Sequence, residues 1–106
     1  MSQVTTHVLD TAAGRPAAGV AVRLERDSAV LADGETDADG RIGDLGPDLL
    51  EPGTYRLRFE TSARSGFFPE VVVAFTVADD AHVHVPLLLS PFGYSTTRSN
   101  LVSALP

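Results

Sequence analysis

Apolar and polar residues alternate along most of this chain. The clearest case is residues 54–60, where Tyr55, Leu57 and Phe59 alternate with polar residues, two of them arginine. Alternation with a period of two places one set of side chains on one face of a β-strand, so this segment is predicted to be a strand with one buried face. The same reasoning predicts strands at 20–24, 71–77 and 82–85, and at the two ends of the chain, 4–9 and 94–98.

Clusters of glycine, proline and aspartate separate these runs about every ten residues. They lie at 13–16, 32–34, 37–40, 51–53 and 78–80. Such residues favour turns, and no long window carries apolar residues at helical spacing. Short strands separated by turns at this spacing are typical of a β-sandwich, so the chain is predicted to be all-β. Residues 1–106 are expected to form a single domain, because domains commonly have about 100 to 150 residues.

Charge and composition narrow the classes of partner. The chain has 8 basic residues, all arginine, against 14 acidic ones, and its formal net charge is −6. No basic stripe is present to neutralise phosphates, so nucleic acid is not an expected partner. No apolar run approaches the roughly 20 residues of a membrane span, and the N-terminus does not resemble a signal peptide. We therefore expect a cytoplasmic protein without a membrane partner.

Three histidines are the most reactive side chains of this chain, which has no cysteine. His82 and His84 alternate with valine and share one strand face, and His7 belongs to the first predicted strand. Three histidines can bind zinc, but this spacing is not diagnostic, and we predict no metal and no cofactor. A lone strand histidine is more often structural than catalytic. The sequence lacks a nucleophile elbow, a phosphate loop and a dinucleotide fingerprint, so any hydrolysis is expected to use water directly.

Three segments carry recognisable motifs: 6–11 followed by 14–20, then 37–41, then 67–71 followed by 82–96. Together they resemble the transthyretin-like family, in particular its 5-hydroxyisourate hydrolase branch. The resemblance implies an eight-stranded β-sandwich that assembles into a homotetramer, a dimer of dimers, around a central channel. It also implies a small-molecule substrate: the hydrolases of this family open the cyclic amide ring of 5-hydroxyisourate, a product of urate oxidation.

The resemblance implies His7, Arg41 and His84 as catalytic residues. Histidine suits activation of water because its pKa lies near neutral pH, and arginine suits stabilisation of an oxyanion because it is permanently charged. Which histidine acts as base and which as donor stays open. We interpret His82 as a channel-lining or surface residue, and Asp10 as a residue that stabilises a turn.

The C-terminal stretch departs from the hydrolase branch. Where that branch ends in Tyr-Arg-Gly-Ser, this chain has Thr97-Arg98-Ser99-Asn100 and then continues through residues 101–106. Arg98 and Asn100 are the positions expected to bind substrate. The altered tail leaves two alternatives open: an enzyme acting on another cyclic amide or a specialised metabolite, and a small-molecule carrier without catalysis.

A second departure follows the strand at 54–60. The family usually has a short helix there, but only residues 61–66 remain before the motif that begins at Phe67. Six residues allow little more than one turn at about 3.6 residues per turn. The helix is therefore expected to be reduced or absent.

Overall fold

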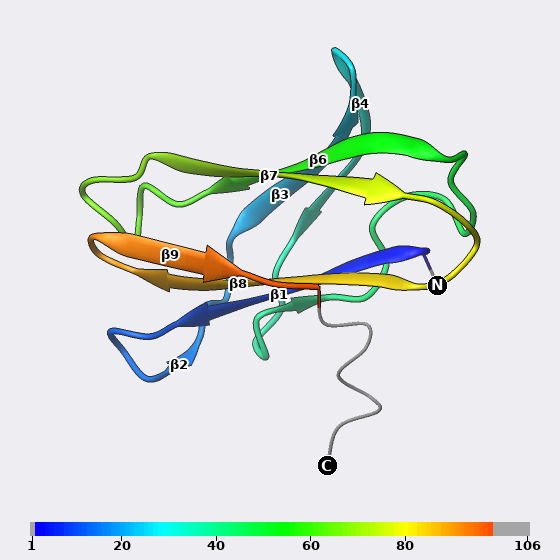
Figure 1. The fold of residues 1–106 in the computed structure, drawn as a ribbon. Coiled ribbons are helices and arrows are strands. Elements are labelled where there is room, and N and C mark those ends of the chain that lie inside the picture. Colours follow the sequence, from blue (N-terminus) through cyan, green and yellow to red (C-terminus); the bar gives the residue numbers. More distant parts are fainter. Residues whose placement is uncertain (1, 99–106) are drawn as a thin grey trace.

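The computed structural model describes residues 2–98, which form two β-sheets packed face to face (Figure 1). Two of the strands are only two residues long. The strands are β1 (Val4–Asp10), β2 (Arg15–Pro16), β3 (Ala21–Arg26), β4 (Ala29–Glu35), β5 (Arg41–Ile42), β6 (Gly53–Glu60), β7 (Glu70–Val77), β8 (Val83–Ser90) and β9 (Gly93–Thr96).

The first sheet brings together the two ends of the described chain. Its order is β2-β1-β8-β9, and β5 also pairs with β1. Strands β1 and β8 are parallel, whereas every other pairing is antiparallel. The second sheet has the order β4-β3-β6-β7. The parallel pair places Thr5 opposite His84, although 79 positions separate them in the sequence.

The space between the sheets is filled by the apolar side chains of the alternating runs. Tyr55, Leu57 and Phe59 of β6 are at most 1 % exposed, as the period-two pattern predicts. From the first sheet, Val8 and Leu87 are fully buried and complete the core. Burial of these side chains is the main source of stability for a domain of this size. The residues that alternate with them in β1 and β8 therefore face away from the core.

All six predicted strands are confirmed, within a few residues at their ends. The predicted strand at 82–85 extends to Ser90 and ends before Pro91, as expected for a residue that cannot donate to the sheet. The prediction of a turn at 32–34 is wrong, because these residues lie inside β4. A side chain at Gly34 would lie 3.2–3.3 Å from the side chains of Leu45 and Ile42, so this glycine makes room for packing instead of a turn.

The helix expected to be reduced is a single turn. The backbone N–H groups of Arg64 and Ser65 both donate to the carbonyl of Thr61, and the chain then leaves the helical path. Residues 2–98 contain no helix, which confirms the all-β prediction. Accordingly, this part of the chain has no helix long and apolar enough to cross a membrane.

Candidate active site

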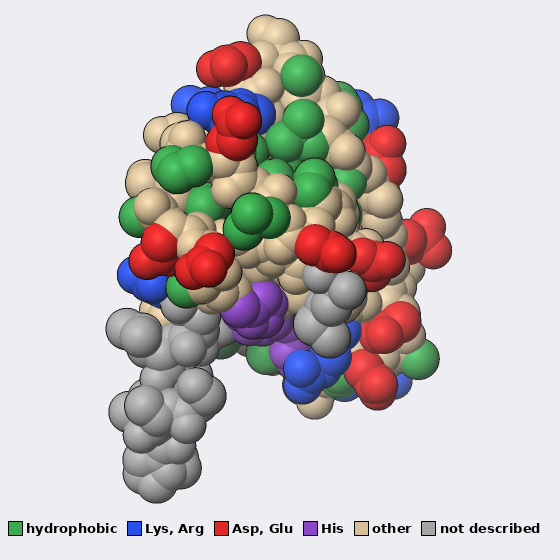
Figure 2. Space-filling view, turned by 90° about the vertical axis from the view of Figure 1, so that its right-hand side faces the viewer, with side chains coloured by type: hydrophobic (Ala, Val, Ile, Leu, Met, Phe, Trp, Pro, Cys, Tyr) green, Lys and Arg blue, Asp and Glu red, His purple; other side chains and the backbone are tan. Residues whose placement is uncertain are grey.

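His7, Arg41 and His84 lie together on the outer face of the first sheet. Since Val4 and Val8 of β1 point into the core, the intervening His7 points out. Arg41 of β5 is the register partner of His7, and His84 comes from the neighbouring strand β8. Histidine side chains meet at the surface beside an arginine in Figure 2. Three strands thus bring together the three residues that the family resemblance singles out.

A shallow pocket opens beside this group, with a volume of about 330 Å³. Arg41 and Gly43 line it together with Thr5, His82 and His84. An arginine and two histidines thus border one space that is open to solvent. Such a pocket suits a small, electron-rich molecule that needs both an acid-base group and a positive charge.

The ring of His7 is held by a backbone group. Its Nε2 lies 2.9 Å from the carbonyl oxygen of Asp39. A carbonyl can only accept a hydrogen bond, so Nε2 must carry a proton. In the neutral form of His7 the lone pair is therefore on Nδ1. The contact fixes both the orientation of the ring and its tautomer.

The loop that supplies this carbonyl is tightly built. The Asp37 carboxylate accepts hydrogen bonds from the backbone N–H groups of Asp39 and Arg41, at 2.9 and 3.0 Å. The Val8 N–H donates to the carbonyl of Gly40 at 2.7 Å. Gly40 has a φ of 75°, and a Cβ there would lie 2.5 Å from the Val8 carbonyl oxygen. Only glycine fits, and the loop thereby fixes Arg41 relative to His7.

His84 is half-buried and shares a hydroxyl with His82. The Thr5 Oγ1 lies 2.8 Å from His84 Nδ1 and 2.8 Å from His82 Nε2. Burial lowers the pKa of His84 below the ordinary histidine value, and the positive charges that His7, His82 and Arg41 carry when protonated lower it further. His84 is therefore neutral, and able to accept a proton, at neutral pH.

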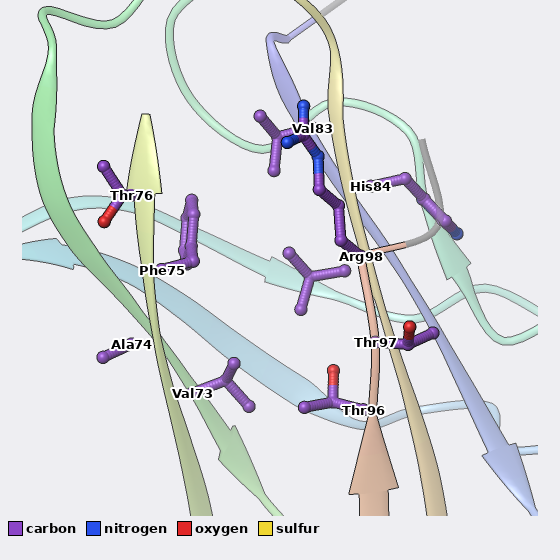
Figure 3. Close-up of a pocket in the computed structure, with 10 residues that line it drawn as sticks. Val73, Ala74, Phe75, Thr76, Val83, His84, Thr96, Thr97 and Arg98 are labelled. Atoms are coloured by element: carbon purple, nitrogen blue, oxygen red, sulfur yellow. The ribbon is translucent and has the colours of Figure 1, made fainter. Parts of the chain in front are cut away.

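Arg98 borders a second groove, of about 330 Å³, between β7 and the β8–β9 pair. Its side chain extends toward Val83, whereas His84 and Thr97 point to the other side of β8 (Figure 3). Of the candidate catalytic residues, His84 lines this groove together with Arg98, whereas His7 and Arg41 are not among the residues that line it. Asn100 lies outside the described residues. The substrate-binding roles of both stay predictions.

Asp10, interpreted from the sequence as a turn residue, has that role. Its carboxylate accepts a hydrogen bond from the Ala13 N–H at 2.9 Å and forms an ion pair with Arg64 at 3.2 Å. The Ala13 hydrogen bond and, more weakly, Arg64 lower the pKa of Asp10. Within residues 2–98, no group of three or more histidine, cysteine, aspartate or glutamate side chains is arranged to hold a metal ion.

Residues 4–99 match the sequence profile of the HIUase/Transthyretin family. The chain belongs to this family. A 5-hydroxyisourate hydrolase of Caulobacter vibrioides is 45% identical over 115 aligned positions, covering 94% of this chain and 100% of the relative. The similarity to the family therefore extends over nearly the whole domain.

Two solved structures of the family show how close the fold is. The Klebsiella pneumoniae 5-hydroxyisourate hydrolase has a TM-score of 0.84 at 38% identity and covers 92% of this chain and 98% of its own. Sea bream transthyretin in complex with thyroxine has a TM-score of 0.82 at 31% identity, with coverages of 90% and 92%. The fold alone therefore does not separate hydrolase from carrier, whereas the sequence identity is higher to the hydrolases.

The sequence interpretation missed Thr5. A threonine on a strand is an ordinary residue, and its contacts with two histidines depend on the register between β1 and β8. One signal was available: Thr5 lies two residues before His7 and therefore on the same face of the strand. His82 was interpreted as a channel-lining or surface residue, and it is exposed, but its hydrogen bond to Thr5 was not foreseen.

Proposed function

We propose that this chain hydrolyses the cyclic amide ring of 5-hydroxyisourate, as a step in the degradation of urate. Relatives named 5-hydroxyisourate hydrolase match over nearly the full length of both chains, at up to 45% identity. The observation that carries the proposal is the placement of His7, Arg41 and His84 on adjacent strands of one sheet, with Arg41 and His84 lining the same open pocket. These residues supply a neutral base, a permanent cation and a second imidazole.

His84 is the proposed base. Its lowered pKa keeps it unprotonated at neutral pH, so it can take a proton from the attacking water as the water oxygen bonds to the ring carbonyl carbon. The carbonyl oxygen gains negative charge in this step. We assign the stabilisation of that charge to Arg41, because its guanidinium is permanently positive and the residue lines the same pocket.

His7 is the proposed acid. When the carbon–nitrogen bond of the ring breaks, the leaving nitrogen needs a proton. Because Nε2 of His7 is committed to the Asp39 carbonyl, the proton must come from Nδ1 of the imidazolium form. The proton taken up by His84 then returns to His7 through solvent, which closes the cycle without a cofactor.

The direct test is incubation with freshly generated 5-hydroxyisourate, following the loss of its absorbance against the spontaneous rate. We expect a clear acceleration. His84 must be neutral to act as the base, and its pKa is lowered. We therefore expect kcat/KM to reach half of its maximum, on the acid side of the pH profile, at a pH below the ordinary histidine pKa of about 6.5. Activity should rise on that side of the profile as the pH increases. No acceleration over the spontaneous rate would refute the substrate, and opening of a different cyclic amide would favour the second enzymatic alternative.

We also propose that the chain works as a homotetramer, a dimer of dimers. Among the described residues, β9 and β7 each lie at one edge of their sheet, and an edge strand can pair with a second chain. Next to them lie aromatic side chains that a monomer leaves in water: Phe67, Phe92 and Tyr94 are 66 %, 83 % and 46 % exposed. Exposed aromatic clusters of this kind are typical of interfaces.

Light scattering in dilute neutral buffer tests this assembly. We expect the mass of about four subunits, since closed symmetric assemblies are usual for homo-oligomers. Replacing Phe92 with serine should shift the protein toward smaller species, because it removes apolar surface from the interface. A wild-type monomer with full activity would contradict the proposal.

A further inference from the structure

One threonine hydroxyl connects the active-site His84 to a histidine that the proposed mechanism does not use. Thr5 is buried, with 6 % exposure, and its Oγ1 lies 2.8 Å from a ring nitrogen of His84 and 2.8 Å from one of His82. The two rings are tilted by 37° with centroids 6.4 Å apart, so they do not stack on each other. The hydroxyl is therefore the link between them.

The number of available protons restricts the directions of the two hydrogen bonds at Thr5. A threonine hydroxyl has one proton to donate, although its oxygen can also accept. When both histidines are neutral, Thr5 can donate to only one of the two ring nitrogens. The other nitrogen must then carry its own proton and donate to the Thr5 oxygen. The tautomers of His82 and His84 are thus tied together.

Only one of the two arrangements leaves His84 able to act as a base toward the pocket. If Thr5 donates to His84 Nδ1, the single proton of neutral His84 lies on Nε2, and no ring nitrogen has a free lone pair for water. If His84 Nδ1 donates to Thr5 instead, the lone pair is on Nε2. Thr5 then donates its own proton to Nε2 of His82, which must be an acceptor.

We propose that His82, acting through the Thr5 hydroxyl, is a positioning residue that holds the lone pair of His84 on Nε2. This inference rests on the proposed function only in assigning the base role to His84. His82 is exposed to solvent, whereas His84 is half-buried, so the hydrogen-bond chain ends at the protein surface while the inner histidine is held in a single tautomer. The chain runs from His84 through Thr5 to His82, each group donating to the next.

The same link serves the step in which His84 becomes charged. When Nε2 takes a proton from water, the imidazolium still donates from Nδ1 to the Thr5 oxygen. The hydroxyl keeps donating to His82, so no hydrogen bond is lost as the charge develops. A hydrogen bond to the charged form favours that form, which offsets part of the cost of burying it. Groups that oppose the charge are His7 on β1, Arg41 on β5 and His82 itself.

The decisive measurement is ¹⁵N NMR of the histidine rings at pH 8, where neutral tautomers dominate. In the wild-type protein we expect the proton of His84 on Nδ1 and the proton of His82 also on Nδ1. Thr5→Val keeps the shape of the side chain and removes the hydroxyl, and His82→Phe removes the acceptor. Both should shift His84 toward the Nε2–H tautomer, which is usually preferred in solution. Thr5→Ser should restore the wild-type signature.

Kinetics provide the second readout. Thr5→Val and His82→Phe should lower kcat by at least about tenfold with little change in KM, since the wrong histidine tautomer costs up to about 10⁴-fold in kcat in a serine-protease triad. Thr5→Ser should recover most of the loss. Thr54→Val is the matched control, because Thr54 is an exposed threonine on β6 in the other sheet. It should leave both kcat and the NMR signature unchanged.

The outcomes separate this inference from the proposed function. Wild-type His84 protonated on Nε2 would overturn the inference whatever the activity. An unchanged kcat in Thr5→Val with an altered tautomer would also overturn it, because the position of the proton would then not matter for turnover. If the NMR signatures follow expectation but the wild-type protein does not open 5-hydroxyisourate, the hydrogen-bond chain stands and the proposed substrate fails.

Discussion

Replacing His84 with alanine is expected to lower the turnover of 5-hydroxyisourate by about 100-fold or more, the usual contribution of a general base. Replacing Arg41 with alanine should have an effect of similar size, because removing one group that stabilises an oxyanion commonly costs about 10²- to 10³-fold in kcat. His7→Ala should fall in the same range. Steady-state kinetics with freshly prepared substrate, corrected for spontaneous decay, measure all three.

These substitutions should leave the fold intact. Arg41 is exposed, and His7 and His84 lie outside the apolar core, so the midpoints of thermal unfolding should move little. Arg23→Ala is the matched control for loss of an arginine, since Arg23 is an exposed residue on the second sheet that pairs with Asp33. It should retain full turnover. If all three active-site variants kept wild-type turnover, the proposed site would be wrong.

Replacing Gly40 with alanine is expected to damage stability and catalysis together. The left-handed backbone at Gly40 costs an alanine roughly 1 kcal/mol, and the added Cβ would also collide with the Val8 carbonyl oxygen. We expect a loss of at least about 2 kcal/mol in the free energy of unfolding. Turnover should fall as well, because the loop that positions Arg41 and the Asp39 carbonyl must move. Urea unfolding at a fixed protein concentration, with kinetics on the same samples, tests both effects.

Two other glycines separate the cost of the left-handed backbone from the cost of the steric contact. Gly19 has a φ of 76°, but nothing lies within 4 Å of a Cβ added there, so Gly19→Ala should show the backbone cost alone. Gly66 has no such φ and also faces open space, so Gly66→Ala should change stability by less than about 0.5 kcal/mol. Neither should alter turnover. If the Gly40 and Gly19 variants lost the same free energy of unfolding, the contact of the added Cβ with β1 would be unimportant.

The strands of the core were predictable because burial imposes a period on the sequence. Tyr55, Leu57 and Phe59 must all point the same way, and this constraint is visible without any structure. Strand β4 was missed because it lies at a sheet edge, where Val30 and Leu31 are both substantially exposed and no alternation is enforced. Gly34 was misinterpreted for a related reason. From sequence alone, a glycine that makes room for neighbouring side chains cannot be distinguished from a glycine in a turn.

The candidate site was predictable only through the family resemblance. Nothing in the local sequence distinguishes His7 or Arg41 from surface residues, since their proximity depends on a pairing between β1 and β5. The contacts of Thr5 with His82 and His84 were out of reach for the same reason, because a strand pairing across 79 positions leaves no local pattern. Periodicity gives the face on which a side chain lies, but not its neighbour on the next strand.

The parallel pairing of β1 with β8 has a consequence for how the protein is made. A ribosome releases the first histidine of the site early and the last one when most of the described chain has been synthesised. Pairing of segments so distant in sequence is entropically costly and slow, so local hairpins such as β3–β4 should form first. Catalytic competence should therefore appear late in refolding, together with closure of the first sheet. The rate at which activity recovers would then report the rate at which β1 pairs with β8.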